Sequence, residues 1–311
     1  MSSCTLGIDT SNYTTSVAVS RDGRITDFRK KLLDVKEGER GLRQSEALFQ
    51  HVTRLPELMD GIGKNGPPDA VGVSTKPRDA EGSYMPCFLA GVSAAASVAS
   101  AASVPLFGFS HQRGHIAAAL YSAGREDLIH DRFLTFHISG GTHELLLYEY
   151  GEIKIAGKTL DISAGQLIDR TGVMTGLGFP CGAEMERLAD PSLKKVRPVI
   201  KGFDCNLSGF ENSVSLMLRK GVPAGEIYSF VFSAVLETVS AMIQKALDEH
   251  GRMPVLLAGG VSSNRMISEA LSERFGVLCA EPRFSSDNAA GIARLSEMCL
   301  LGELDIKPIR S

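Results

Sequence analysis

The sequence lacks the features that mark secreted, membrane-spanning and strongly basic proteins. Its six cysteines are scattered without a CxxC pair, so we expect reduced thiols in the cytoplasm. The longest apolar run that we identify, residues 90–104, is rich in Ala and Ser and too short to span a membrane. The N-terminus enters a strand at once, without the regions of a signal peptide. A net charge of −3 gives no overall basic field that would indicate nucleic acid.

What remains is the composition of an ordinary globular protein, with 43% hydrophobic and 22% charged residues. A chain of 311 residues is long enough for about two domains with a substantial core. One local cluster of basic residues could form a nucleic-acid contact, although a solvated face is the more common role of such a cluster. Its members are Arg29, Lys30, Lys31, Lys36, Arg40 and Arg43.

One pattern occurs twice in the sequence, over residues 6–25 and 135–153. Each copy has an apolar strand, a small polar turn, an alternating strand and a Gly that opens a third strand. One offset aligns Asp9 with His137, Ser11 with Ser139, Val17 with Leu145 and Gly23 with Gly151. We interpret this as an internal repeat with a cleft between the two turns, whose amides and hydroxyls suit phosphate. Two unrelated hairpins are the alternative.

After each set of three strands, helices and strands alternate, which predicts an α/β fold with a mixed sheet in each half. The boundary is expected in the polar stretch 121–132. The last helix would pack best on the first domain, which would then be discontinuous. Residues 190–209 combine Pro, Gly and charge without periodicity, so we expect a long loop at the mouth of the cleft.

The strongest chemical signal is SHQRGH, which begins where a predicted strand ends. The four-residue spacing places His111 and His115 on one face of a helix, which is half of a typical transition-metal site. Residue 112 is Gln, so the glutamate of the HExxH zinc peptidases is absent. Capping or packing is the alternative role of the two histidines.

Two further residues are candidate metal ligands. Asp287 precedes the last helix in SSDNAAG, where capping of that helix alone would also explain an Asp. His137 stands in mid-strand, where an aliphatic residue is expected, and a buried imidazole needs a partner such as a metal. Without the repeat, His137 would be interpreted as a hydrogen-bonded core histidine.

Polar groups for a nucleotide are predicted in the second half. Gly259 and Gly260 would let a ligand approach the backbone, with Ser263 and Asn264 placed to bond a ribose or base. Tight packing alone would also explain the two glycines. Asp169 lies near the middle of a predicted helix, where it is either solvated or bonded to a hydroxyl.

Taken in order, these motifs resemble those of the TsaD-type proteins, formerly called O-sialoglycoprotein endopeptidases. The motifs, within residues 5–296, are IDTS, SHQRGH, SGGTHELL, DISAGQLIDRTG, FPCG, LSGFENSV, AGGVSSNRM and SSDNAAGIA. The resemblance implies two tandem RNase H-like domains of the actin/sugar-kinase/Hsp70 ATPase type with an interdomain cleft. The first would comprise residues 1–125 with the C-terminal helix at about 288–311, and the second residues 126–287.

The resemblance also implies an activity. TsaD-type proteins transfer a threonylcarbamoyl group from its adenylate to the adenosine next to the anticodon of tRNA. It implies one divalent metal, iron or zinc rather than magnesium, and ATP or an adenylate nucleotide. The implied partners are tRNA and a companion protein of related fold, in the cytoplasm and without a membrane.

The family's site residues transfer by position. The metal ligands would be His111, His115 and Asp287, with His137 where some members have a metal-binding Tyr. The phosphate-side turn would be Ser139, Gly140, Gly141 and Thr142, and the ribose and base contacts Asp169, Gly182 and Asn264. No residue is assigned a catalytic role.

The sequence also departs from the family pattern, mainly by losing acids. Tyr13 and Thr14 stand in place of an Asp-Glu pair, Arg113 stands in place of a Glu or similar residue, and Ile162 stands in place of the second Asp of DDA. In addition, Cys181 replaces the first Gly of a Gly-Gly pair, and the segment PRDAEGSY replaces a GPGL turn. An alternative is therefore a diverged paralogue, non-catalytic or differently specific, that binds nucleotide and metal and scaffolds a partner. An ordinary kinase or ATPase fits less well, because these enzymes use cleft carboxylates with magnesium.

Overall fold

The structure is a computed structural model that describes all residues except 1, 12, 36–41, 65, 286, 287 and 311. Of the residues singled out above, Lys36, Arg40 and Asp287 lie outside the described part. The chain forms two compact units, Met1–Tyr121 with Asp287–Ser311 and Ser122–Ser286. It therefore leaves the first unit after residue 121 and returns to it at residue 287.

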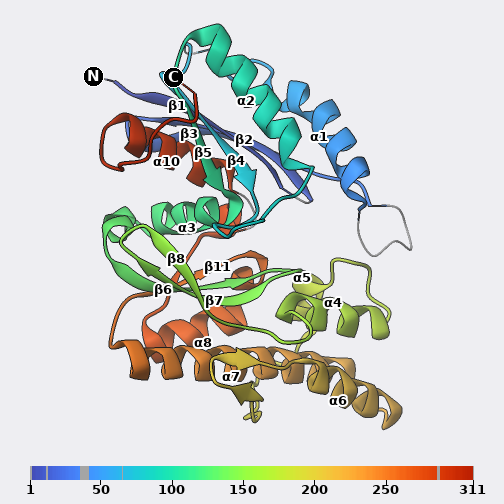
Figure 1. The fold of residues 1–311 in the computed structure, drawn as a ribbon. Helices are drawn as coiled ribbons and strands as arrows, with labels where there is room; N and C mark the ends of the chain where they lie inside the picture. Colours follow the sequence, from blue (N-terminus) through green and yellow to red (C-terminus); the bar gives the residue numbers. More distant parts are fainter. Residues whose placement is uncertain (1, 12, 36–41, 65, 286–287, 311) are drawn as a thin grey trace. The chain divides into compact units, whose positions relative to one another are not determined.

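The first unit contains a five-stranded mixed sheet in the order β3-β2-β1-β4-β5 (Figure 1). The strands are β1 (Cys4–Ser11), β2 (Thr14–Arg21), β3 (Arg24–Leu32), β4 (Ala70–Lys76) and β5 (Leu106–Ser110). β1, β2 and β3 are antiparallel neighbours, whereas β4 runs parallel to both β1 and β5. The carboxyl ends of β1, β4 and β5 therefore lie at one edge of the sheet, where α/β proteins place their ligands.

Helices pack on both faces of this sheet. The apolar side chains of β1, β2 and β4 form a core with α1 (Gln44–Met59) and α2 (Phe88–Ala102). On the other face, α10 (Ala289–Leu300) crosses the sheet where Gly7 and Gly72 lack side chains. A Cβ on Gly7 would lie 2.3 Å from the carbonyl oxygen of Ala289. The last helix of the chain is thus an integral layer of the first unit.

The second unit repeats the same sheet topology, in the order β8-β7-β6-β11-β12. Its strands are β6 (Arg132–Ile138), β7 (His143–Glu149), β8 (Glu152–Lys158), β11 (Val255–Ala258) and β12 (Leu278–Cys279). The pairing register repeats as well, because Cys4 faces Arg21 in the first unit and Arg132 faces Glu149 in the second.

The turn between the second and third strands also repeats. Asp22 and Gly23 have positive φ angles of 48° and 78°, and Tyr150 and Gly151 have 49° and 94°. Positive φ at both central residues is typical of a type I′ turn, in which the second residue is usually Gly. The predicted internal repeat is therefore confirmed down to its register and its turn.

The helices of the second unit form a hydrophobic core with its sheet. They are α4 (Ala164–Met174), α5 (Gly182–Leu188), α6 (Ser208–Arg219), α7 (Ala224–His250), α8 (Arg265–Phe275) and α9 (Pro282–Ser285), with 3-10 turns at Glu126–His130 and Gly260–Ser263. The helix α3 (His111–Ser122) connects the two units in the sequence.

The expectation that no apolar segment reaches membrane-spanning length was wrong for α7. Its 27 residues are long and apolar enough to cross a membrane, but 78% of its most apolar stretch is buried within the protein. Residues such as Val231, Phe232 and Val235 have no exposed surface. We therefore describe α7 as the central core helix of the second unit.

The segment 190–209 is not the single long loop expected from its composition. It contains the hairpin of β9 (Ile200–Lys201) and β10 (Asp204–Cys205), and α6 begins at Ser208. The segment is bound to α7, because the Ser229 hydroxyl donates to the carbonyl of Asp190 at 2.5 Å and the Lys194 amide donates to Ser233 at 2.9 Å. Local composition did not reveal these long-range contacts.

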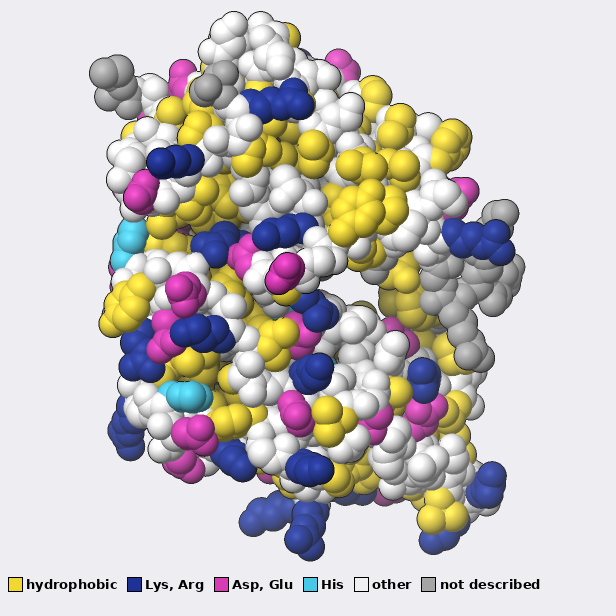
Figure 2. Space-filling model, in the orientation of Figure 1, with side chains coloured by type: hydrophobic (Ala, Val, Ile, Leu, Met, Phe, Trp, Pro, Cys, Tyr) yellow, Lys and Arg dark blue, Asp and Glu magenta, His cyan; other side chains and the backbone are white. Residues whose placement is uncertain are grey.

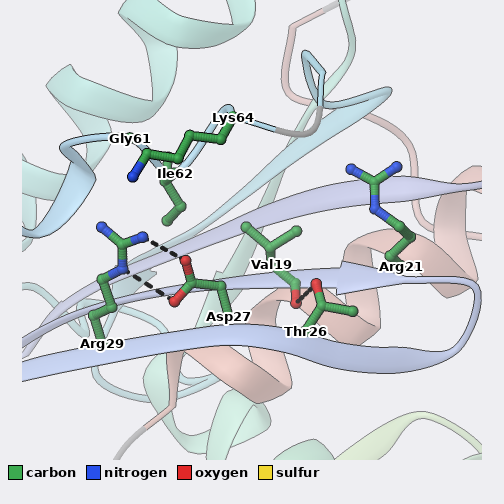
Figure 3. Close-up of a pocket in the computed structure, with 8 residues that line it drawn as sticks. All are labelled: Val19, Arg21, Thr26, Asp27, Arg29, Gly61, Ile62 and Lys64. Carbon is green, nitrogen blue, oxygen red and sulfur yellow. Dashed lines mark hydrogen bonds and ion pairs between the residues drawn. The ribbon is translucent and has the colours of Figure 1, made fainter.

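Charges of both signs are mixed on the face of the protein that Figure 2 shows. In the basic cluster of the first unit, Lys31 pairs with Glu57 at 2.8 Å and Arg29 with Asp27 at 2.5 Å. A hollow of about 170 Å³ lies beside this pair, between β2, β3 and residues 61–64 (Figure 3). Arg29 also donates to the carbonyl of Leu58 at the end of α1. These contacts give at least part of the cluster a structural role.

Candidate functional site

The paired histidines lie at the beginning of α3, which follows β5 without a loop. The imidazole rings of His111 and His115 have their centroids 4.6 Å apart, at the carboxyl end of β5. The first turn of the helix is capped locally, because Ser110 accepts the amide of Arg113 at 3.1 Å. The structure thus places both imidazoles together, as the four-residue spacing predicts.

A buried carboxylate on β1 holds the first imidazole. Asp9 is 1% exposed, and its Oδ2 lies 3.1 Å from Nδ1 of His111 and accepts the hydroxyl of Ser11 at 3.0 Å. Burial opposes ionisation of Asp9, but the charge and hydrogen bond of His111 and the bond from Ser11 prevail, so the pKa of Asp9 lies below its usual value. A carboxylate on one ring nitrogen fixes the tautomer and orientation of a metal-ligating histidine.

The N-terminal end of α10 meets the same imidazole. The side-chain amide of Asn288 donates to the backbone carbonyl of His111 at 2.9 Å and lies 3.2 Å from Nε2 of its ring. The two helices approach closely at glycines, since a Cβ on Gly291 would lie 2.0 Å from the carbonyl oxygen of Gly114. Asn288, not Asp287, occupies the N-cap position of α10.

In the second unit, the turn between β6 and β7 forms a small loop of backbone amides. The Ser139 amide donates to the carbonyl of Thr142 at 2.8 Å, and the Thr142 amide donates to the Ser139 hydroxyl at 3.1 Å. Among the described residues, no atom lies within 4 Å of a Cβ built on Gly140 or Gly141. The outer side of this turn is therefore open to a ligand.

The N-terminus of α4 packs directly against this turn. Ser163 caps the helix by accepting the amide of Gln166 at 3.1 Å, while its hydroxyl donates to the carbonyl of Gly140 at 2.8 Å. A Cβ on Gly165 would lie 2.6 Å from both the Cα of Gly140 and the carbonyl oxygen of Ser139. The turn and the helix N-terminus together offer backbone N–H groups of the kind that bind phosphate.

The glycine pair after β11 has two different roles. Gly259 has φ of 96°, and a Cβ there would lie 2.3 Å from the carbonyl oxygen of Ile138 and 2.9 Å from Cδ2 of His137. Packing against the end of β6 therefore explains Gly259. Among the described residues, Gly260 has no atom within 4 Å of its hypothetical Cβ and could accept a close ligand. His137 is 7% exposed at this end of β6.

The predicted ribose and base contacts already have structural partners. Asp169 accepts the amide of Cys181 at 2.9 Å, and burial raises its pKa more than this bond lowers it. Gly182 begins α5 next to this contact. Asn264 caps α8, where its side-chain oxygen accepts the amide of Ile267 at 3.0 Å. Any nucleotide contact would have to use the remaining polar atoms of these side chains.

The imidazole groups of His111 and His115 are chemically suited to a transition metal. Imidazole nitrogen is a ligand of iron and zinc, and the carboxylate beside His111 matches the outer partner of such ligands. Within the described residues, however, no three His, Cys, Asp or Glu side chains form a group that could hold a metal ion. His111 and His115 thus account for half of a site, and Asp287 lies outside the described residues.

The sequence model of the TsaD family, tRNA N6-adenosine threonylcarbamoyltransferase, matches residues 50–294, which contain both histidines and the β6–β7 turn. The chain belongs to the TsaD family. One relative with this name, from a strain of Thermus thermophilus, is 30% identical over 301 residues, covering 93% of this chain and 90% of the relative. Another, from Methanopyrus kandleri, is 29% identical over 286 residues, covering 87% of this chain and 82% of the relative.

Solved structures agree with this TsaD assignment at the level of fold alone. Component A of the (R)-2-hydroxyglutaryl-CoA dehydratase of Acidaminococcus fermentans is 18% identical with a TM-score of 0.57, covering 96% of this chain and 99% of that one. A full-length HypF is 13% identical with a TM-score of 0.63, covering 98% of this chain and 56% of that one. A ROK glucokinase from Streptomyces griseus is 12% identical with a TM-score of 0.52, covering 95% of this chain and 98% of that one. The three structures confirm the predicted actin/sugar-kinase/Hsp70 type of fold.

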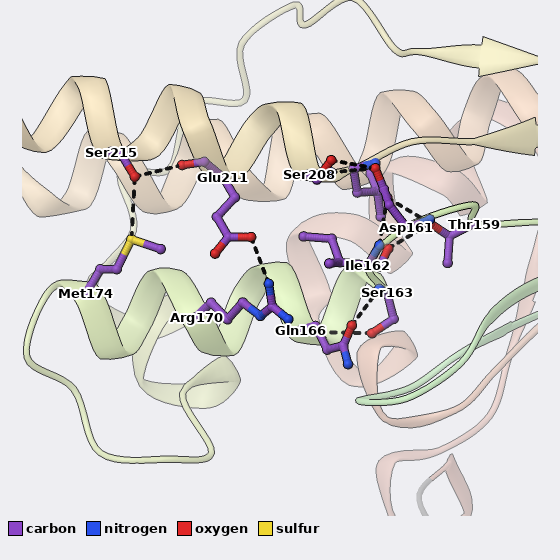
Figure 4. Close-up of polar contacts among 11 residues, drawn as sticks. Thr159, Asp161, Ile162, Ser163, Gln166, Arg170, Met174, Ser208, Glu211 and Ser215 are labelled. Atoms are coloured by element: carbon purple, nitrogen blue, oxygen red, sulfur yellow. Dashed lines mark hydrogen bonds and ion pairs between the residues drawn. The ribbon is translucent and has the colours of Figure 1, made fainter. Parts of the chain in front are cut away.

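One important carboxylate was not singled out by the sequence reasoning. Asp161 accepts hydrogen bonds from the amides of Leu207 and Ser208 at 2.8 and 3.1 Å, and from the Ser208 hydroxyl at 2.6 Å (Figure 4). It joins the segment before α4 to the beginning of α6. The TsaD motif DDA pointed to this position, but attention went to its second residue, Ile162, which is 8% exposed.

His143, in the motif SGGTHELL, is a second residue that the sequence did not single out. It is 1% exposed, and neither ring nitrogen has a hydrogen-bond partner among the described residues. Burial lowers its pKa to about 4, partly offset by Asp161, so the imidazole is neutral at pH 7. It is the first residue of β7 and follows the β6–β7 turn of this TsaD member directly in the sequence.

Proposed function

We propose that the protein is a threonylcarbamoyltransferase that moves this group from its adenylate to an adenosine of tRNA. The family match supports the reaction, and relatives with the corresponding name cover most of the chain. The observation that carries the proposal is the pair of imidazoles on α3, of which Asp9 holds the first. The turn that would bind phosphate is also present in this family member.

The proposed ligands of one divalent metal are His111, His115, His137 and Asp287. Iron or zinc suits this set better than magnesium, because imidazole nitrogens predominate and magnesium prefers oxygen. When bound, such a metal would act as a Lewis acid on the carbonyl group to be transferred. Asp9 would keep the His111 imidazole oriented toward it.

The proposed nucleotide is ATP or an adenylate. The amides of the β6–β7 turn and the N-terminus of α4 would bind its phosphate, and Gly260 would allow a close approach at the end of β11. Asp169, Gly182 and Asn264 remain proposed contacts of the ribose and base, and Gly259 remains proposed, with Gly260, as a place where the ligand approaches the backbone. We further propose tRNA as acceptor, a companion protein of related fold and a cytoplasmic location.

A non-catalytic or differently specific paralogue is the second candidate. One observation favours it: Ile162 is buried where the family pattern has an acid, and Arg113 carries the opposite charge to the family residue. At these two positions the chain thus has fewer acids than the family pattern. The two candidates share the metal and nucleotide ligands and differ in whether modified tRNA is formed.

Reconstitution separates the two candidates. The full chain is combined with threonine, bicarbonate, ATP, an adenylate-forming enzyme, a candidate companion protein and unmodified tRNA, and digested tRNA is analysed by mass spectrometry. Threonylcarbamoyladenosine supports the transferase, and His111→Ala should abolish its formation. His130→Ala, at an exposed histidine, is the matched control. Metal binding that depends on His111 without modified adenosine would instead support the paralogue.

A further inference from the structure

Two of the departures from the family pattern contact each other in the structure. Arg113 stands between the paired histidines, and Asp79 belongs to the segment PRDAEGSY that replaces the GPGL turn. Nε of Arg113 donates to Oδ2 of Asp79 at 2.9 Å, and Nη2 lies 2.9 Å from the same oxygen. Both side chains are mostly buried, with 17% and 22% of their surface exposed.

The segment PRDAEGSY makes further contacts with the beginning of α3. The amide of Gln112, a first-turn group that needs an acceptor, donates to the carbonyl of Pro77 at 3.0 Å. Lys76 lies 3.6 Å from the other oxygen of Asp79. The segment is closed on itself by the amide of Arg78, which donates to the Ser83 hydroxyl at 3.0 Å. It therefore forms an ordered support beside the first turn.

The residues that follow this segment reach His111 from another side. The ring of Phe88, the first residue of α2, meets the His111 imidazole edge to face with centroids 6.2 Å apart. The carbonyl of Cys87 accepts the hydroxyl of Thr10 at 3.1 Å, which ties this end to β1. The loop between β4 and α2 thus contacts the first turn of α3 through Asp79 and Pro77, and the first residue of α2 contacts the His111 ring.

Helix geometry separates Arg113 from the imidazoles. It lies two residues after His111 and two before His115, so it projects about 200° around the helix from each of them. The ion pair therefore holds the side of the turn opposite to the imidazoles. Asp9 and Asn288 hold the imidazole side through their contacts with His111.

We propose that Arg113 and Asp79 are positioning residues for the histidine pair. Their ion pair fixes the rotation and position of the first turn of α3, and so the direction of both imidazoles, without touching the metal or the substrate. In this chain the Arg113–Asp79 ion pair holds the first turn of α3 in place. The acid of the family pattern at position 113 could not form this pair, because it would repel Asp79. The function of this pair rests on the proposed metal site, whereas its geometry rests on the contacts of Arg113 with Asp79 and of Gln112 with Pro77.

The first test is a double-mutant cycle read by Co²⁺ titration of the metal-free full chain. Arg113→Ala and Asp79→Ala should each lower Co²⁺ affinity about tenfold, the lower end of the effect of second-layer partners. The double variant should lose no more than either single variant, because the two side chains act as one unit. The charge-swapped variant Arg113→Asp with Asp79→Arg should regain part of the affinity.

A matched control removes an ion pair of the same kind elsewhere in the first unit. Asp27→Ala breaks the pair with Arg29 shown in Figure 3 and should leave Co²⁺ affinity unchanged. If it weakens Co²⁺ binding as much as Asp79→Ala does, or if the losses in the cycle are additive, a general loss of stability explains the data and the positioning role is refuted.

A second measurement does not depend on metal. Amide hydrogen exchange of the metal-free protein should show the first turn of α3, including Gln112, exchanging at least tenfold faster in Arg113→Ala and not in Asp27→Ala. Unchanged exchange would overturn the proposal. If the unmodified chain bound no Co²⁺ while the exchange difference was present, the proposed metal site would fail and the positioning of the helix turn would stand.

Discussion

At the scale of single residues, the hydrogen-bonded carboxylates of this protein have different structural roles. Asp9 orients an imidazole, whereas Glu297 is fully buried on α10 and accepts the hydroxyls of Ser3 and Ser20 and the amide of Gly23. Asp161 joins two segments that are far apart in the sequence. The residue type alone does not distinguish these roles, because the partners are set by the fold.

The hydrogen bonds of Asp161 predict a pH dependence of stability. Burial would raise its pKa, but the bonds from Leu207, Ser208, Asn206 and Ile162 outweigh burial and hold the pKa well below its usual value. A group with a lowered pKa in the folded state contributes stability above its unfolded value of about 3.9, and this contribution is lost as the pH falls below it. Acidification should therefore weaken the junction with α6.

We expect Asp161→Asn to lower the midpoint of thermal unfolding by a few degrees at pH 7. The difference from the unmodified protein should begin to shrink as the pH is lowered from 5 to 3, because Asp161 then takes up a proton in the unfolded state while it stays ionised in the folded state. Differential scanning calorimetry across this range measures both effects. Asp305→Asn, at an exposed site, is the control. A difference that is constant with pH would contradict the linkage.

At the scale of elements, the turn between β6 and β7 depends on the absence of a side chain in α4. Gly165→Ala would place a Cβ 2.6 Å from the backbone of Gly140 and Ser139, where no flexible side chain can yield. We expect the turn to be displaced and the affinity for ATP to fall about tenfold, which corresponds to 1.4 kcal/mol. Isothermal titration calorimetry measures this loss.

The chain offers a close control for this substitution. Gly209 is the second residue of α6, as Gly165 is of α4, and no described atom lies within 4 Å of a Cβ built there. Gly209→Ala should bind ATP normally and gain up to about 1 kcal/mol of helix stability. Equal ATP affinity of the two variants would refute the phosphate role of the turn.

Long helices and strands with a regular apolar pattern were predictable from the sequence. A helix whose first turn is capped by a residue far away in the sequence was not. The apolar repeat of α7 and the strand–turn–strand copies appear directly in the sequence, and the structure confirms them. The start of α6 was not predicted because its capping carboxylate, Asp161, lies 47 residues away. The pairing of Arg113 with Asp79 was equally invisible, since each had been recognised only as a separate departure from a family pattern.

At the scale of the whole molecule, the two units differ in how their cores are assembled. The core of the second unit is built from residues between 134 and 277. The sheet of the first unit is covered on one face by α10, which follows the second unit in the sequence. Residues 1–121 therefore lack the helix that packs against Gly7 and Gly72.

We predict that residues 122–286 produced alone fold and unfold in one cooperative thermal transition, while residues 1–121 produced alone do not. Circular dichroism melting curves compare the two segments. Adding residues 287–311 to residues 1–121 through a flexible Gly/Ser linker should restore cooperative unfolding to the first unit. A cooperative transition of residues 1–121 without α10 would contradict the prediction.

The late position of α10 has a consequence for biosynthesis. Domains generally mature from the N-terminus onward while the ribosome is still elongating the chain. Here the first unit must wait for residues 289–300, so the second unit, which ends at residue 286, can be completed before it. Until residues 289–300 have been synthesised, the uncovered face of β1 and β4 is the part of the nascent chain that most needs protection by chaperones.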